Sequence, residues 1–259
     1  MRILITTLLS LFICAPTLAE HSSTHFNQDS FVALNAYRGL VEEHIEGVAR
    51  SLRLIASTDE AKSAKWDTVK PLVTKLSSEL PTDAASWLAL PDGSYHTSEP
   101  EEAGIELNIK DRPYFSSLMS GTPVFGDLVI SKSTGHRSVI IAVPVLATDG
   151  KTVAAVGVSL RVRLLSDLVG QCLKLTPREY FYALHETDTK IVLHSFAERM
   201  FKTPSDVGDE ALGARFKEEL KHDHGSFEYE LNGNKIASIF ELSPKLKWYF
   251  FLAREISAP

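Results

Sequence analysis

One order of predicted elements occurs twice along this chain, and it constrains the fold more than any single motif does. Two short strands, a helix and three further strands are predicted over residues 86–160, and the same order returns over residues 180–254. Tight turns separate the strands, among them Pro91–Gly93 and Asn232–Asn234, where glycine accepts the positive φ of a hairpin turn. The two segments share this order and not their sequence. We therefore expect an α+β protein with two modules, each an antiparallel sheet of about five strands with a covering helix.

A long amphipathic helix is predicted ahead of the first module, over residues 28–57. Its apolar residues are spaced by three, four or seven positions, which is typical of a narrow packing stripe. They are Phe31, Leu34, Val41, Ile45, Val48, Leu52 and Ile55. The stripe fits two arrangements equally well, a seam between two copies of the chain and a contact with the modules of the same chain. A homodimer through this helix is thus one expectation, and a helix that runs alongside both modules is the other.

The first 19 residues have the features of a secretory signal peptide. Arg2 is followed by the apolar run Ile3–Ile13, and small residues then suit cleavage near Ala19. The run is shorter than the roughly 20 residues that span a membrane. Lipidation of Cys14 is the alternative, although Ile13 stands where a lipoprotein cleavage site needs a small residue. The mature protein is therefore expected to be periplasmic or secreted.

Composition limits the partners of the mature chain. Without residues 1–19, whose only charge is Arg2, the chain has 33 acidic against 26 basic residues, a net charge of −7. A surface of this sign disfavours nucleic acid and anionic lipid as partners. Only Cys172 remains after cleavage, so no intramolecular disulfide is expected. A chain of this length is long enough to rest on an apolar core instead.

These patterns divide the chain into five parts. They are a signal peptide (residues 1–19), a helical segment (20–80), the first module (81–161), a linking helix (162–178) and a smaller second module (179–259). The covering helix of the first module is predicted from Asp111 to Ser120. Asp111 is placed as its N-cap and Pro113 in its first turn.

Three short motifs in the first module resemble those of extracytoplasmic double Cache domains, the PAS-like sensor modules of chemotaxis receptors and sensor kinases. They are Pro-Asp-Gly-Ser-Tyr at Pro91–Tyr95, Asp-Arg-Pro-Tyr-Phe at Asp111–Phe115 and Ser-Lys-Ser-Thr-Gly at Ser131–Gly135. The likeness covers most of the mature chain, and in the second module it rests on the order of elements and on Trp248. It implies two PAS-like modules, of which the first is the membrane-distal type, with a ligand pocket between its sheet and the Asp111 helix.

The resemblance also implies which residues bind the ligand. Matched by position, they are Arg112, Tyr114, Phe115, Phe125, Asp127 and Ser159. Arg112 corresponds to the arginine that holds a ligand carboxylate in amino-acid-binding members. Leu107 stands where those members have an aromatic residue, and Ser159 where a last aspartate would hold the ligand's ammonium group. These departures argue against an α-amino acid and leave a carboxylate or another small polar metabolite open.

The residues themselves leave other roles open for the same positions. Taken alone, Arg112 is better explained by an ion pair with Asp111, Asp127 or Glu106 than by a ligand, and the resemblance favours the ligand role. Asp127 fits a turn-side hydrogen bond equally well. Trp87 is expected in the core, because it begins an inward-facing strand.

Enzymatic and metal-binding motifs are not found. The chain has no Gly-x-Ser-x-Gly elbow, and Ser131–Gly135 lacks the glycines of a phosphate loop. The nine histidines show no zinc-binding spacing, so neither a metal nor a cofactor is expected. The sequence thus favours an exported sensor that binds a small organic ligand and signals to a membrane-bound receptor or kinase. A ligand-free periplasmic interaction or dimerisation module is the alternative, and an exported hydrolase is the least favoured reading.

Overall fold

The computed structural model describes residues 26–99, 107–132 and 135–256. The predicted signal peptide, its cleavage near Ala19 and the lipidation alternative at Cys14 lie outside these residues. The helical segment consists of α1 (Phe26–Ala56), α2 (Asp59–Lys62) and α3 (Trp66–Glu79). None of the described helices has both the length and the apolar character that crossing a bilayer requires.

The first module holds five strands and a short helix. They are β1 (Ala84–Ala89), β2 (Tyr95–Thr97), α4 (Phe115–Met119), β3 (Val124–Ile130), β4 (Arg137–Leu146) and β5 (Thr152–Arg161). The helix α5 (Val162–Leu173) leads into the second module. Its elements are β6 (Glu179–His185), β7 (Ile191–His194), the 3-10 turn η1 (Ala197–Arg199), α6 (Pro204–Val207), α7 (Glu210–Glu219), β8 (His224–Leu231), β9 (Asn234–Ser243) and β10 (Trp248–Ile256).

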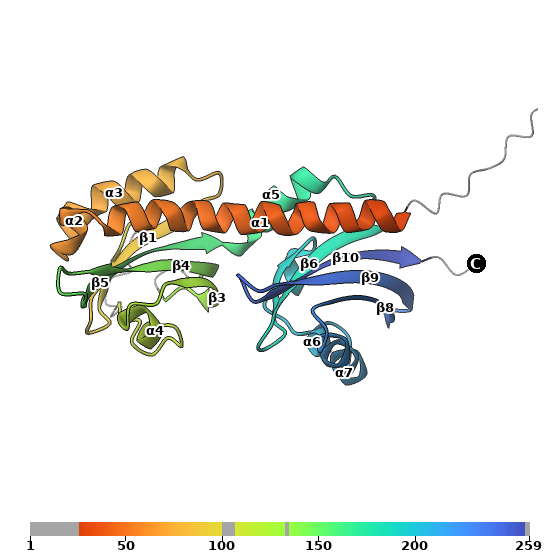
Figure 1. Ribbon diagram of the computed structural model, residues 1–259. Helices are drawn as coiled ribbons and strands as arrows, with labels where there is room; N and C mark the ends of the chain where they lie inside the picture. Colours follow the sequence, from red (N-terminus) through yellow and green to blue (C-terminus); the bar gives the residue numbers. More distant parts are fainter. Residues whose placement is uncertain (1–25, 100–106, 133–134, 257–259) are drawn as a thin grey trace, which may run out of the picture.

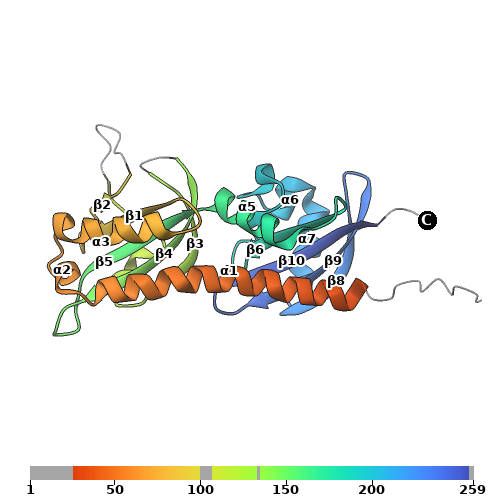
Figure 2. The same ribbon diagram turned by 90° about the horizontal axis from the view of Figure 1, so that it is seen from above.

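The two sheets have the same topology. Their strand orders are β2-β1-β5-β4-β3 and β7-β6-β10-β9-β8, and every pairing of strands is antiparallel. One face of each sheet is covered by α1, joined by α3 on the first sheet and α5 on the second (Figure 1, Figure 2). The other face carries α4 in the first module and α6 with α7 in the second (Figure 1). The predicted α+β fold with two five-stranded modules is confirmed.

The apolar stripe of α1 packs against the sheets of its own chain. Its central members are at most 2% exposed, namely Leu34, Val41, Ile45, Val48 and Leu52. On the same face Tyr37 packs edge-on against Phe181 and Phe250, with ring centroids 5.2 and 5.0 Å away. The stripe therefore joins both modules into one core, and Phe31 alone of its predicted members is exposed, at 44%. The stripe is thus occupied within the chain, and the homodimer predicted through this helix stays a prediction.

The covering helix of the first module begins later than predicted. α4 starts at Phe115 with Tyr114 as its N-cap, after a turn in which the N–H of Phe115 donates to the carbonyl of Arg112 at 3.0 Å. The Asp111 side chain instead accepts a hydrogen bond from Lys132 Nζ at 2.7 Å. The prediction of Asp111 as N-cap was wrong, because a lysine beyond the next strand takes its carboxylate.

The two modules meet at a β-bulge in β3. The register between β3 and β4 shifts at Gly126, which has a φ of +90°. The indole Nε1 of Trp248, a fully buried residue of β10, donates to the carbonyl of Gly126 at 3.2 Å. A Cβ at Gly126 would lie 3.0 Å from that nitrogen. Both the positive φ and the close approach of the indole therefore require glycine here.

Candidate ligand-binding site

A small cavity lies on the α4 side of the first sheet. Its walls come from β1, β2, β4, β5 and β3 and from the turns next to α4 and β3. The apolar part of the wall belongs to a small core cluster that is separate from the main core along α1. The cavity measures about 30 Å³, which is room for water but not for an organic molecule.

Three of the predicted ligand-binding residues line this cavity: Arg112, Tyr114 and Ser159. Arg112 Nη2 donates to the backbone carbonyl of Ile130 at 2.7 Å. Tyr114 is buried, and burial raises the pKa of its hydroxyl above the ordinary value. The hydroxyl of Ser159 accepts a hydrogen bond from Trp87 Nε1 at 3.1 Å.

Two predicted residues do not line the cavity. Phe115 packs in the small cluster as part of the base of α4. Phe125 pairs with Ile141, which belongs to the core on the α1 side, and the guanidinium of Arg53 lies 5.4 Å from its ring centroid. The bulge at Gly126 adds one residue to β3, so that Phe125 faces α1. The structure thus separates Phe125 from the site with which its motif grouped it.

Asp127 lies between the cavity and the second module. It is the cross-strand partner of Ile140, which lines the cavity, although Asp127 itself does not. Burial raises the pKa of its carboxyl, and the charges of His185 and Lys247 in the second module oppose this rise. Its charge also acts on the hydroxyl of Tyr114. The charge of Asp127 therefore interacts both with a residue of the cavity wall and with charged residues of the neighbouring module.

We expect Asp127→Asn to make the protein more stable at pH 7. A carboxyl whose pKa is raised on folding contributes most stability below its unfolded pKa, about 3.9, and this contribution is lost as the pH rises through the folded value. Asparagine does not ionise, so its advantage should shrink as the pH falls from 7 towards 4. Urea denaturation of both proteins at several pH values measures the difference. A variant that is less stable than the parent at pH 7, or a difference independent of pH, would contradict this placement.

Most of the lining residues were not among the predicted site residues, and those with large or charged side chains include Trp87, Tyr95, Glu99 and Lys132. Trp87 was expected in the core, and it is both a buried member of the small cluster and part of the cavity wall. Tyr95 and Glu99 are four positions apart, so their side chains fall on the same face of an extended strand, and this alternation was the available signal. The sequence does not show how β2 pairs with β1, so it could not show that this face lines the pocket.

The charged groups of the cavity are paired unequally. Lys132 is paired with Asp111, and Glu99 with Arg161. No described residue forms an ion pair with Arg112, and its guanidinium donates a hydrogen bond to a backbone carbonyl. Neither Asp111 nor Asp127 lies within ion-pair distance of Arg112, although the pKa of the Asp111 carboxyl is lowered mainly by Lys132 and also by the charge of Arg112. Glu106 lies outside the described residues. A positive group of this kind beside a cavity favours an anionic ligand.

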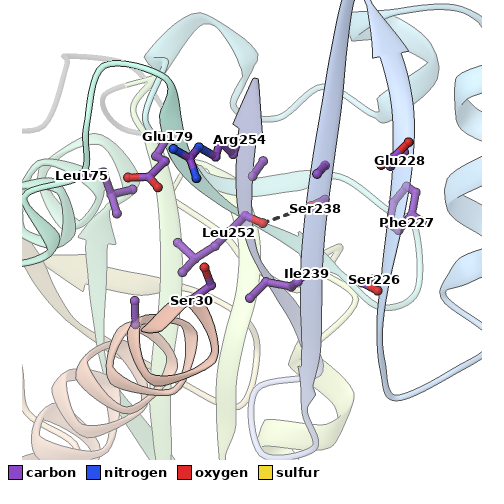
Figure 3. A pocket seen from close by; sticks show the side chains of 13 residues that line it. Ser30, Leu175, Glu179, Ser226, Phe227, Glu228, Ser238, Ile239, Leu252 and Arg254 are labelled. Carbon is purple, nitrogen blue, oxygen red and sulfur yellow. Dashed lines mark hydrogen bonds between the residues drawn. The ribbon is translucent and has the colours of Figure 1, made fainter. Parts of the chain in front are cut away.

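A larger hollow of about 530 Å³ lies in the second module (Figure 3). It follows the strip of the second sheet beside the first turns of α1, with Leu252 and Ile239 at its centre. Glu179 and Arg254 lie at one end, and Glu228 lies on β8 at the opposite side (Figure 3). Its wall is mostly apolar, and the Ser238 hydroxyl donates a hydrogen bond to the carbonyl of Leu252 at 3.3 Å. By volume alone, this groove is the better candidate for a ligand site. The convergent polar groups of the smaller cavity favour a site in the first module.

In the second module, the equivalent place holds a cavity of the same size, about 30 Å³, whose wall includes Tyr182, His194 and Arg199. His194 stacks on Tyr180 and on Tyr182 with ring centroids 5.6 Å apart in both cases, and Tyr182 stacks on Phe251 at 4.4 Å. Burial lowers the pKa of His194 to about 3, so this imidazole is neutral at pH 7. No group of three or more His, Cys, Asp or Glu within the described ranges is arranged to hold a metal ion.

Comparison with known proteins gives a family and a set of similar structures. A family model described as a Cache domain matches residues 16–258. An extracellular ligand-binding receptor from Desulfohalobium retbaense has a TM-score of 0.70 at 13% identity, over 87% of this chain and 40% of that chain. The ligand-binding domain of the Pseudomonas aeruginosa chemoreceptor PctB, in complex with L-Arg, has a TM-score of 0.67 at 18% identity, over 88% and 86%.

The ligand-binding domain of the Pseudomonas fluorescens chemoreceptor CtaA, in complex with L-isoleucine, is similar too. Its TM-score is 0.64 at 18% identity, and the match covers 88% of this chain and 90% of that chain. No curated protein gives a sequence match. At these identities the structural likeness establishes a shared fold, while the family match rests on nearly the whole sequence.

Proposed function

This chain belongs to the Cache domain family, and on that premise we propose that it is an exported sensor whose first module binds a small organic carboxylate. The proposal depends chiefly on the environment of the Arg112 guanidinium. This group lines the cavity and donates to a backbone carbonyl, and it forms no ion pair within the described residues. The similar chemoreceptor domains were solved with amino acids bound, which supports a small carboxylate-bearing ligand.

Binding would exchange one hydrogen bond for a stronger pair. Arg112 would give up the carbonyl of Ile130 and donate two parallel hydrogen bonds to the ligand carboxylate. Tyr114 and Trp87 would form the apolar walls, and the Trp87–Ser159 hydrogen bond would hold the indole in place. Because the cavity holds only about 30 Å³, the side chains around it must move apart for the ligand to enter.

The signal would then travel along β3. Ile130, which releases Arg112, lies on the same strand as Gly126, which receives the hydrogen bond of Trp248 from the second module. A ligand shifts such an arrangement only by its difference in affinity between two conformations. We propose that the shifted surface is read by a membrane-bound receptor or kinase, with the protein exported to the periplasm and with a homodimer through α1 as one mode of assembly.

A thermal-shift screen of small organic carboxylates tests the binding. A ligand at about 100 times its Kd should stabilise the folded protein by about 2.7 kcal/mol. Arg112→Ala should abolish that stabilisation. Arg163→Ala is the matched control, because Arg163 lies on α5 with a side chain that is 75% exposed. The proposal fails if no carboxylate stabilises the protein, or if Arg112→Ala responds as strongly as Arg163→Ala does.

The small volume of the cavity favours a second candidate, a ligand-free interaction module. In that case the walls around Arg112 are packed for stability alone. Arg112→Ala would then change stability, and no small molecule would change the melting temperature of either protein. The same screen therefore separates the two candidates.

A further inference from the structure

Ser159 does not supply the carboxylate that would bind a ligand ammonium group, but Glu99 does. Glu99 lies in the row of residues that face Ser159 across the neighbouring strands. Ala85 is the partner of Ser159 across β1 and β5. Thr97 pairs with Trp87, and the N–H of Ser98 donates to the carbonyl of Ser86 at 2.8 Å, so continuing the register sets Glu99 beside Ala85. Glu99 therefore stands two strands from Ser159, a spacing of about 10 Å. Only the methyl group of Ala85 lies between them in the row.

Glu99 is a partly buried carboxylate that shares its counter-ion. Its side chain is 13% exposed and lines the cavity. Arg161 Nη2 lies 2.9 Å from Glu99 Oε1, and Arg161 Nη1 lies 2.8 Å from Asp83 Oδ2. One guanidinium thus serves two carboxylates, which leaves one negative charge over. Asp83 is 59% exposed and does not line the cavity, so water solvates its charge, whereas the charge of Glu99 lies at the cavity wall.

Glu99 and Arg112 carry opposite charges and lie towards opposite edges of the sheet, where both line the same cavity. Arg112 is anchored to Ile130 of β3, one edge strand, and Glu99 follows β2, the other edge strand. Between them, the Ser159 hydroxyl is engaged by Trp87. An α-amino acid carries its two charges on adjacent carbons and reaches only one of these groups. A molecule that satisfies both must separate its charges by a longer chain.

We propose that the ligand of the first module is an ω-amino carboxylate, whose carboxylate meets Arg112 and whose ammonium group meets Glu99. This rests on the proposed function and extends it, because it makes Glu99 the residue that selects the ligand. The ammonium group takes the place of Arg161 as partner of one Glu99 oxygen, and Arg161 keeps its ion pair with Asp83.

Two isomers provide the test, since 5-aminovalerate and norvaline differ only in the position of the ammonium group. Isothermal titration of the purified protein should show 5-aminovalerate binding at least about tenfold more tightly than norvaline and than valerate, a ratio equivalent to about 1.4 kcal/mol. In Glu99→Gln the preference over valerate should disappear, while valerate itself binds as before. Glu60→Gln is the matched control, because Glu60 is exposed on α2 and does not line the cavity, so this variant should keep the preference.

These experiments distinguish a failure of the ω-amino carboxylate assignment from a failure of the proposed carboxylate-binding function. If none of the three probes binds and the carboxylate screen is also negative, the proposed function fails. If valerate binds as well as 5-aminovalerate, or norvaline binds better, the ω-amino assignment is overturned and the carboxylate site stands. Should Glu99→Gln not fold, Glu99→Asp replaces it. Its shorter side chain should move the preference from 5-aminovalerate to 6-aminohexanoate, and an unchanged preference overturns the role of Glu99.

Discussion

Replacement of Trp248 by alanine is expected to lower the free energy of unfolding by about 3–5 kcal/mol, the usual cost of truncating a large buried aromatic residue. Trp248 is fully buried, it packs beside Phe250 at 6.1 Å between ring centroids, and it reaches across to the first module at Gly126. The loss therefore opens a cavity and also removes a contact between the modules. Urea denaturation followed by circular dichroism measures it.

Trp248→Phe separates these two contributions. Phenylalanine keeps much of the ring and loses the N–H that donates to Gly126, so the buried carbonyl is left without this donor at a cost of about 1–3 kcal/mol. This variant should also weaken communication between the modules. Ligand-dependent protection from hydrogen exchange should persist in β1 and β5 and decrease in β10. Protection that extends through β10 in both variants would exclude Trp248 as the connection.

Substitution of Gly157 by alanine is expected to destabilise the protein by about 1–3 kcal/mol and to abolish ligand binding. The Trp87 indole lies directly over Gly157, and an added Cβ would overlap the ring. Trp87 is buried, so the indole would have to move into the cavity and give up its hydrogen bond to Ser159. Calorimetric titration with a carboxylate found in the screen, together with urea denaturation, measures both effects.

Gly39→Ala is the control with the opposite sign. Gly39 lies on the exposed face of α1, and nothing stands within 4 Å of the position of an added Cβ. Alanine should stabilise the helix there by about 0.5–1 kcal/mol and leave ligand binding unchanged. A Gly157→Ala variant that resembles Gly39→Ala in stability and in binding would show that Trp87 does not shape the site.

The parts of the fold that depend on local sequence were predictable. Turn residues such as Asp92 and Gly93 set the hairpins, and the repeated order of strands gave two sheets of the same topology. The stripe on α1 was predictable as a stripe but not in its partner, because packing within a chain and between chains has the same period. Burial of its central residues against both sheets decided between them.

The parts of the site that depend on distant contacts were not predictable. Asp111 looked like a helix cap because the sequence does not show that Lys132 reaches its carboxylate. Phe125 was assigned to the pocket because a motif does not show which way a strand faces after the bulge at Gly126. Glu99 was missed since its place in the row of Ser159 follows from two successive strand registers.

A crystal structure of the protein with a carboxylate found in the screen would show whether Arg112 holds the ligand in the first module. The ligand carboxylate should lie about 2.7–2.9 Å from the Arg112 guanidinium. The bond from Arg112 to the carbonyl of Ile130 should then be broken. A ligand seated instead in the groove beside Leu252 and Ile239, with Arg112 still bonded to Ile130, would contradict this proposal.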